Sequence, residues 1–520
     1  MPPKAVVFSF LSLVAASSCS DSNAEPDSDK GQPELTLIST YRTGVFDDGA
    51  AEIIAYHPQT KRIFSVNGGA GAIDILDISD IKNPKKIKSV EVGSGGVTCV
   101  AAREEFIVAT VAAEGLGAGE VVFLNSDGEI LNKLEVGSLP DHVAVSKDSK
   151  YVLVCNEGEP SDDYKEDPVG SISLIEMGED IAKMDQSAVT TIGFEGLTRE
   201  GLDKSVRIFG PGATVAQDLE PEYGRFTPEG DKAYVVCQEN NAMAIIDVPN
   251  KKLVAVKGLG FVDHSKPGFG FDSSDKSDSI DIKPQPTKGI YQPDAFDIKT
   301  IGGKNYLVLT NEGDARDYEG FSEEIRVEDL KLDPKAFPNA EELQKPENLG
   351  RLKTTTTMGD TDGDGDHDEI YSYGARSFSI RDEDLNLLYD SGNSLAKNAL
   401  KALEGREDTK DPKFFKGRSD DKGVEPEAVA VGELNGKTYA FIGMERLGGI
   451  AVYDISTPEK PNFVTYAINR DFSADIDSPE AGDVAPECIL FIPADESPNG
   501  EALIAISNEV SGTISFFSFK

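Results

Sequence analysis

The sequence predicts an all-β fold, a seven-bladed β-propeller closed by an N-terminal strand, with long loop insertions on one face. Two observations favour this class. A phrase of two short apolar strands, which starts with an acidic residue and ends in Asn-Glu or a close variant, recurs along the 520 residues. Most copies are followed by two further short strands, so that four strands recur at a spacing of about 40 residues, which is typical of propeller blades.

Seven copies of this phrase can be found. The five clear copies occupy residues 140–157, 221–239, 293–312, 426–445 and 486–509. Two weaker copies lie at 51–67 and 96–111. Because the repeat is uniform and helical periodicity is nearly absent, we expect one array of blades rather than several unrelated domains.

The two ends of this array are predicted to pair with each other. The last copy supplies only three strands, at 487–493, 501–507 and 513–519, while the strand-like segment 34–41 has no partner at the front. A ring of blades avoids exposed edges only if these ends meet. We therefore predict that 34–41 completes the seventh blade and that the propeller domain spans 34–520.

The first 33 residues are predicted to direct export. Residues 1–18 carry one Lys and an apolar run that is too short to span a membrane, which indicates a signal peptide. Residues 19–33 are polar and indicate a disordered tether that starts at Cys19, a candidate lipid anchor; cleavage nearby without a lipid is the alternative. We expect an exported protein without a transmembrane span, extracellular, at the cell surface or facing the periplasm.

The charge of the chain restricts its partners. Acidic residues outnumber basic ones 92 to 51, for a formal net charge of −41. This surplus disfavours nucleic acid and anionic membranes as partners and favours divalent cations. An acidic surface that only keeps an exported protein soluble is the alternative. We expect a monomer.

Cysteine and histidine chemistry is not indicated. The cysteines at 99, 155, 237 and 488 lie in apolar strand runs, which predicts buried thiols. Cys155 and Cys237 occupy equivalent places in neighbouring copies, so that their separation should exceed the reach of a disulfide. The four histidines form no metal-ligand spacing such as HExxH.

The acidic strand termini are predicted to encircle one mouth of the propeller channel, because the start of one antiparallel strand and the end of its neighbour share a face. Candidate metal ligands at this mouth are Glu52, Asp141, Glu222, Asp294, Glu312, Glu427 and Glu487. Beside them we expect Glu157, Glu239, Glu445 and Glu509, whereas the second copy carries Thr98. Each acid alone could merely accept loop N–H bonds, but so many like charges require cations or basic partners.

A second candidate cation site lies in the long insertion of the fifth blade, at 313–369. Its loop alternates carboxylates with glycine, and the candidate ligands are Asp360, Asp362, Asp364, Asp366 and Asp368. This spacing lets a backbone turn tightly around one hard cation, which predicts Ca²⁺. An EF-hand would carry Glu at the place of Tyr371, so the loop resembles the integrin-type calcium loop instead. A solvated acidic turn is the alternative; if calcium binds, we expect it to pin the insertion.

Basic residues accompany one mouth carboxylate. Arg418 and Lys422 lie close in sequence to Glu427, and these three are the candidate catalytic or phosphate-binding residues. The same basic groups could equally neutralise neighbouring acids. Arg316 and Arg376 are weaker candidates of the same kind.

Several motifs together resemble a known family. The segments 44–52, 156–160, 360–380 and 418–427 are similar to those of choice-of-anchor I proteins, which include mesenchyme-specific cell-surface glycoproteins associated with biomineralisation. The resemblance covers about 34–520 and implies an exported, surface-attached propeller in contact with calcium or a calcium mineral. More remotely, the chain resembles calcium-dependent propeller phosphatases and phytases. It contains no Asn-x-Ser/Thr sequon, so glycosylation of the animal members does not carry over.

Two functions follow as hypotheses. The first is a noncatalytic binding, adhesion or mineral-associated module that holds a phosphate-bearing or mineral ligand through cations at the acidic mouth. The alternative is a calcium-dependent phosphoesterase, in which mouth carboxylates hold the metal while Arg418 and Lys422 hold phosphate. Against the alternative, the sequence offers no obvious nucleophile or general base other than carboxylates.

Overall fold

The computed structural model describes residues 33–520 apart from 278, 405–414 and 476–477. The predicted signal peptide at 1–18, the candidate anchor Cys19 and all but the last residue of the tether at 19–33 lie outside the described residues. No helix in the described part of the chain has the length and apolar composition needed to cross a membrane.

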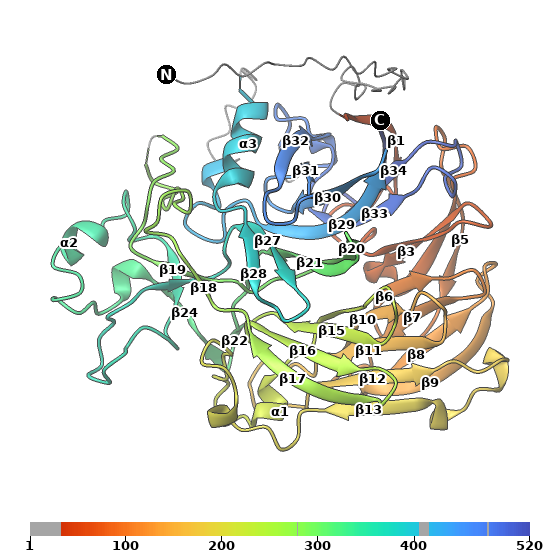
Figure 1. The fold of residues 1–520 in the computed structure, drawn as a ribbon, viewed down its shortest axis with the longest axis horizontal. Coiled ribbons are helices and arrows are strands. Elements are labelled where there is room, and N and C mark those ends of the chain that lie inside the picture. The colour runs from red at the N-terminus through yellow and green to blue at the C-terminus, as the bar shows by residue number, and fades with distance from the viewer. Residues whose placement is uncertain (1–32, 278, 405–414, 476–477) are drawn as a thin grey trace, which may run out of the picture. The chain divides into compact units, whose positions relative to one another are not determined.

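Seven four-stranded antiparallel sheets organise the chain and can be followed by colour from red to blue in Figure 1. The first three contain β2 (Ile54–His57), β3 (Arg62–Asn67), β4 (Ala72–Asp77) and β5 (Lys85–Glu91); β6 (Val97–Ala102), β7 (Ile107–Val111), β8 (Ala118–Leu124) and β9 (Ile130–Ser138); and β10 (Pro140–Val145), β11 (Tyr151–Asn156), β12 (Ser171–Glu176) and β13 (Val189–Gly193).

The next three sheets follow the same up-and-down order, with one long interruption. They contain β14 (Tyr223–Phe226), β15 (Lys232–Cys237), β16 (Ala242–Asp247) and β17 (Lys252–Gly258); β20 (Phe296–Ile301), β21 (Lys304–Asn311), β27 (Ser377–Asp382) and β28 (Leu387–Asp390); and β29 (Pro426–Leu434), β30 (Lys437–Met444), β31 (Ile450–Asp454) and β32 (Asn462–Ala467).

The last sheet joins both ends of the described chain. It contains β33 (Pro486–Ile492), β34 (Leu503–Asn508), β35 (Thr513–Phe519) and β1 (Leu35–Arg42). β1 pairs antiparallel with β35, so that Leu35 lies opposite Phe519 and Arg42 opposite Thr513. These sheets confirm the predicted all-β, propeller-like fold.

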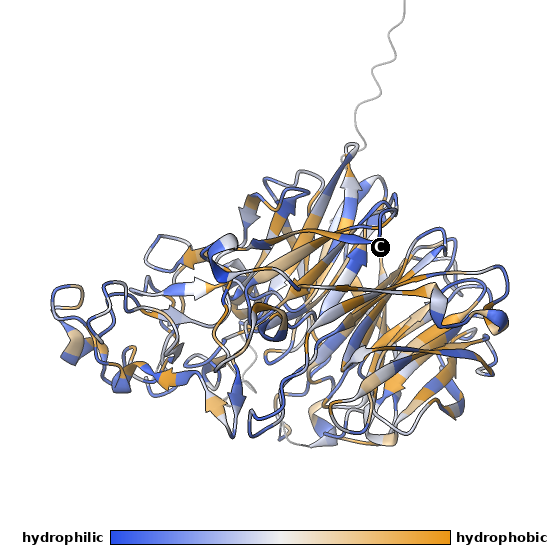
Figure 2. Ribbon diagram, turned by 90° about the horizontal axis from the view of Figure 1, so that it is seen from below, coloured by the Kyte–Doolittle hydropathy of each residue, from blue (hydrophilic) through white to orange (hydrophobic). Residues whose placement is uncertain are grey.

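Hydrophobic side chains join consecutive sheets. One cluster packs Phe64 and Ile75 of the first sheet against Ile107 and Val122 of the second, and the seventh sheet is joined to the first in the same way, by Phe516 and Ile63 among others. The middle four residues of β3 are buried, because neighbouring sheets cover the strand on both faces. Figure 2 shows hydrophobic residues, in orange, along many of the strands. The first strands also contact one another in the order β2, β6, β10, β14, β20, β29, β33 and again β2.

Short elements fill the connections. The insertions contain β18 (Phe261–Asp263), β19 (Lys288–Ile290), β22 (Asp317–Tyr318), β23 (Phe321–Ser322), β24 (Glu324–Arg326), β25 (Lys353–Thr355) and β26 (Tyr371–Ser372), together with α1 (Val215–Asp218), α2 (Ala340–Leu343) and α3 (Ser394–Ala402). Single 3₁₀ turns lie at Gly68–Ala70, Ile181–Lys183, Gln186–Ala188, Arg199–Gly201, Val327–Asp329 and Pro479–Ala481. The segment from β24 to β25 has its own small core around Leu330 and Leu352.

The four described cysteines are free thiols, as predicted. Cys99, Cys155 and Cys237 are buried, whereas Cys488 is half-buried.

Candidate functional site

A repeated backbone feature presents the mouth carboxylates. In β10 and β33 the antiparallel register skips one residue between Pro140 and His142 and between Pro486 and Cys488, so that Asp141 and Glu487 are the extra residues of β-bulges. A bulge leaves one residue outside the ladder and re-aims its side chain. In β6, Thr98 is the extra residue of the equivalent bulge. The second copy of the repeat therefore has the same bulge but no carboxylate at this position.

The residue before each of the prolines Pro140, Pro426 and Pro486 connects the first and second strands of its sheet. Leu139, Glu425 and Ala485 adopt the left-handed conformation, with φ of 44°, 51° and 60°. Their carbonyl oxygens accept hydrogen bonds of 2.8 Å from the backbone amides of Glu157, Glu445 and Glu509, respectively. The strained residue therefore fixes the acid that starts one strand beside the acid that ends the next.

Five of the seven candidate ligands predicted at the mouth line one cavity. A cavity of about 830 Å³ runs along the inner strands and is lined at one end by Glu52, Thr98, Asp141, Glu222, Asp294, Glu487 and Glu509. Burial raises the pKa of Glu52 to about 7, with further contributions from the negative charges of Glu509 and Asp141. Burial likewise raises the pKa of Asp141 to about 7, together with the charges of Glu159 and Glu239.

Three carboxylates from neighbouring sheets form what we call the Glu239 cluster. One oxygen each of Glu157, Glu222 and Glu239 lies within 4.8 Å of the others, and all three side chains are buried. The Oε2 atom of Glu239 is buried and has no hydrogen-bond partner within the described chain. Burial, followed by neighbouring carboxylates, raises the pKa values of Glu157 and Glu222 well above the ordinary value.

A second trio, the Glu427 cluster, consists of Asp294, Glu312 and Glu427, again with one oxygen of each within 4.8 Å of the others. Glu427 Oε2 is buried without a hydrogen-bond partner among the described residues. This trio forms an ion pair, because Lys422 Nζ lies 2.5 Å from Glu312 Oε1, whereas no ion pair of the Glu239 cluster is found among the described residues. Three of the predicted ligands thus come together here.

The basic residues beside the mouth are engaged in ion pairs. Arg418 Nε lies 2.8 Å from Glu425 Oε1, and Arg446 approaches both Glu445, at 3.0 Å, and Glu425, at 3.5 Å. Burial, with the charges of Glu312 and Glu425, raises the pKa of Glu445 to about 8. Sequence reasoning missed Glu425, although its position before Pro426 and Glu427 repeats the acidic pattern.

The weaker arginine candidates lie elsewhere. Arg316 is buried and pairs with Asp218 and, at 2.6 Å, with Glu220. Arg376 donates to the carbonyl oxygens of Ser419 and Asp421 and lies 4.0 Å over the ring of Phe271. Both side chains therefore serve the packing of loops.

The insertion carries a separate acidic loop. Asp360 accepts hydrogen bonds from the amides of Gly363, at 2.7 Å, and Gly365, at 3.0 Å, and so closes the turn that the sequence predicted. The carboxylates form two overlapping trios, Asp360–Asp362–Asp368 and Asp333–Asp366–Asp368. Asp366 is buried, and its Oδ1 has no hydrogen-bond partner within the described chain.

Asp333 was not predicted and carries no local signal, because it is remote in sequence from the loop. It is brought there by backbone contacts: His367 N donates to Lys331 O at 2.8 Å, and Asp333 N donates to His367 O at 3.0 Å. Asp364 belongs to neither trio; its Oδ1 accepts from the amide of Asp366 at 3.2 Å.

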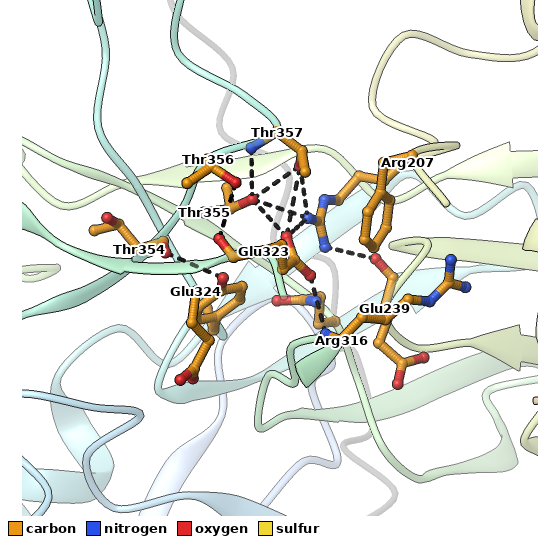
Figure 3. Close-up of polar contacts among 12 residues, drawn as sticks. Arg207, Glu239, Arg316, Glu323, Glu324, Thr354, Thr355, Thr356 and Thr357 are labelled. Atoms are coloured by element: carbon orange, nitrogen blue, oxygen red, sulfur yellow. Dashed lines mark hydrogen bonds and ion pairs between the residues drawn. The ribbon is translucent and has the colours of Figure 1, made fainter. Parts of the chain in front are cut away.

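Buried ionic contacts tie the insertion to the Glu239 cluster (Figure 3). Arg207 pairs with Glu323, whose carboxylate also accepts from Thr355 and, at 3.2 Å, from the amide of Arg316. The same Arg207 donates to the carbonyl oxygen of Glu239 at 2.8 Å. The insertion is thus fastened next to one of the candidate metal ligands.

Comparisons of the sequence find a matching family profile and a relative. The sequence profile described as "Choice-of-anchor I domain" matches residues 52–458. Gigasin-3a of Magallana gigas is 30% identical over 194 residues, which span 33% of this chain and 65% of the length of that relative.

Solved structures with similar folds have little sequence in common with this chain. They include Kuenenia stuttgartiensis hydrazine synthase, with a TM-score of 0.49, 13% identity and coverage of 92% of this chain and 99% of that one. Streptogramin B lyase gives a TM-score of 0.46 and 9% identity, covering 94% and 98% of the two chains. Neither likeness bears on function.

Proposed function

From the premise that the chain belongs to the choice-of-anchor I domain family, we propose that it is a surface-associated propeller that binds calcium at its acidic mouth and holds anionic ligands through that calcium. The family assignment supports surface association. The buried carboxylates and their contacts support the calcium site.

The proposed scaffold is a closed ring of seven blades. Two observations support it: the first strands contact one another in a cycle that returns from β33 to β2, and β1 pairs with β35 as the fourth strand of the last sheet. A closed ring keeps the strand starts of different sheets at fixed separations, which a preformed cation site requires.

The single observation that carries the proposal is the Glu239 cluster. Its three carboxylate groups are buried within 4.8 Å of one another, and Glu239 Oε2 has no hydrogen-bond partner within the described residues. Bringing buried carboxylates together is costly unless they are protonated or share a cation. A donor set made only of oxygens suits a hard cation. Carboxylate ligands without a strict octahedral arrangement suit Ca²⁺ better than Mg²⁺.

The Glu427 cluster is proposed as a weaker cation site. Lys422 already offsets part of its charge through Glu312, so that a divalent cation gains less there than at the Glu239 cluster. The insertion loop is proposed as a structural calcium site that uses Asp360, Asp362, Asp366 and Asp368, with Asp333 as an added ligand.

A binding role is favoured over hydrolysis. The alternative of a calcium-dependent phosphoesterase needs Arg418 or Lys422 free to hold a phosphate group, but both are paired with Glu425 or Glu312. Assay of p-nitrophenyl phosphate and phytate with and without calcium separates the two. We expect no turnover; calcium-dependent turnover that Glu427→Gln abolishes would instead establish the esterase.

Calorimetric titration of calcium into EDTA-treated protein tests the binding proposal. We expect Glu239→Gln to remove one calcium site, because the amide keeps the volume of the side chain but not its charge. The matched control is Glu200→Gln, an exposed residue outside the clusters. Equal stoichiometry and affinity in the wild type and Glu239→Gln would refute the proposed site.

A further inference from the structure

Away from its acidic mouth, the same cavity is lined by basic side chains. Arg225 of β14 lines the cavity three residues after the mouth carboxylate Glu222, and Arg103, which follows β6, lines it from another sheet. At the position equivalent to Arg225, the first and second sheets carry Ala55 and Ala101, which also line the cavity. The two sheets next to that of Arg225 carry Ala144 and Asp297 at this position.

Arg225 has no carboxylate partner. It forms no ion pair within the described part of the chain; it donates to the hydroxyl of Tyr223, and its guanidinium lies 5.0 Å from the centre of that ring. Its Nε is buried and without a hydrogen-bond partner in that part. Asp297 acts on it electrostatically, but the Asp297 carboxylate accepts the amides of Ile298 and Val431, each at 2.8 Å.

Arg103 is a second cation without an ion pair among the described residues. Its guanidinium is held by carbonyl oxygens, those of Ser146 at 3.3 Å, Ala102 at 3.0 Å and Val145. Arg103 and Arg225 both line this cavity. Burial lowers the pKa of Arg103 and the like charge of Arg225 lowers it further, whereas the charge of Glu105 raises it. The acids that line this far end of the cavity, Glu104 and Glu496, are exposed to solvent.

We propose that the channel binds a small oxyanion, a phosphate or a carboxylate, at Arg225 with Arg103 as the second cation. Arg225 forms no direct ion pair among the described residues and keeps an unused buried Nε–H, and the planar donors of a guanidinium match two oxygens of a phosphate or carboxylate. The ring of His142 lies 3.9 Å from that of Tyr223 and holds it in place against Arg225. This site goes beyond the proposed calcium function and does not require the mouth to be occupied.

The test is calorimetric titration of inorganic phosphate into protein kept in EDTA at low ionic strength, so that failure of the calcium sites cannot affect the result. Wild type should bind phosphate, and Arg225→Gln should bind it at least about tenfold more weakly, as expected for a lost charge-assisted hydrogen bond. Arg225→Lys keeps the charge and should lose less. Arg199→Gln, at an exposed position, is the matched control.

The outcomes separate the site from a merely structural role. If Arg225→Gln does not fold, as judged by circular dichroism, Arg103→Gln provides the second variant, with the same direction of change. Displacement of phosphate by acetate would assign carboxylates as the better ligand, and displacement by sulfate but not acetate would assign tetrahedral oxyanions. Absence of phosphate binding by the wild type, or an unchanged affinity in folded Arg225→Gln, would overturn the proposal.

Discussion

Gln238 donates a hydrogen bond from Nε2 to Glu312 Oε2 across 3.0 Å. Its backbone amide also donates to Glu222 Oε1 at 3.3 Å, so that one residue touches a carboxylate of the Glu239 cluster and one of the Glu427 cluster. The two trios are therefore neighbours, joined by the backbone amide and the neutral side chain of one residue.

Replacement of that side chain should destabilise the mouth. In Gln238→Leu the buried Glu312 carboxylate loses a donor, which should lower the free energy of unfolding by about 1–3 kcal/mol in the absence of calcium. Urea denaturation in EDTA measures the change. The control is Gln59→Leu, an exposed glutamine that lines the cavity and lies outside both clusters. Equal losses in the two variants would contradict the specific role of Gln238.

The calcium-free protein should lose stability as pH rises. The pKa values of Glu52 and Asp141 are raised to about 7 and that of Glu445 to about 8, chiefly by burial. The folded state thus binds more protons than the unfolded state between the ordinary carboxyl pKa and these values. The protonated carboxyl groups stabilise the folded state fully at lower pH, and this stabilisation is lost as the pH rises through about 7 to 8.

Calcium should reverse this trend, because it binds the deprotonated carboxylates. Thermal unfolding in EDTA and in calcium, followed from about pH 5 to about pH 8, checks both statements. The stabilisation by calcium should grow across this window. Stability in EDTA that increases from the lower to the higher pH would contradict the assignment of the raised pKa values.

The anchor of the insertion should be energetically strong. Glu323 and Arg207 are both buried, so Glu323→Gln leaves an uncompensated guanidinium and should destabilise the protein by about 3–5 kcal/mol. Because Arg207 also donates to the carbonyl of Glu239, we expect weaker calcium binding at the Glu239 cluster as well. Urea denaturation and calorimetry measure the two effects.

Replacing both partners by neutral residues separates the effect of charge on stability from the effect of packing. The double variant Arg207→Met, Glu323→Gln removes the unpaired charge, so it should be more stable than Glu323→Gln alone. A double variant that is the less stable of the two would show that the contacts of Arg207, rather than its charge, dominate.

Asp333 should matter to the insertion loop despite its distance in sequence. Asp333→Asn should weaken one calcium site at least about tenfold, since even the loss of an outer hydrogen-bond partner of a metal ligand costs that much. Asp362→Asn with Asp364→Asn should remove the site. Asp329→Asn, an exposed neighbour, is the control. Unchanged calcium stoichiometry in the Asp362/Asp364 variant would refute calcium at the loop.

The repeated phrase was sufficient to predict the propeller-like fold, because each copy encodes a local hairpin with an acid at each end. The family was predicted from other segments, among them 44–52 and 418–427. The phrase also predicted that residues such as Asp294 and Glu312 share a face. The phrase could not predict the trios, because the approach of Glu239 to Glu157 depends on how neighbouring sheets pack. Arg225 was missed for the same reason: its lack of a partner is visible only when residues from all sheets are in place.

The most direct test of the calcium mouth is a crystal structure determined with calcium, with anomalous differences recorded. We predict a peak between Glu157, Glu222 and Glu239, with carboxylate oxygens at about 2.3–2.6 Å from it. The absence of a peak at this position at saturating calcium would contradict the proposed site, provided that the three carboxylates keep their places.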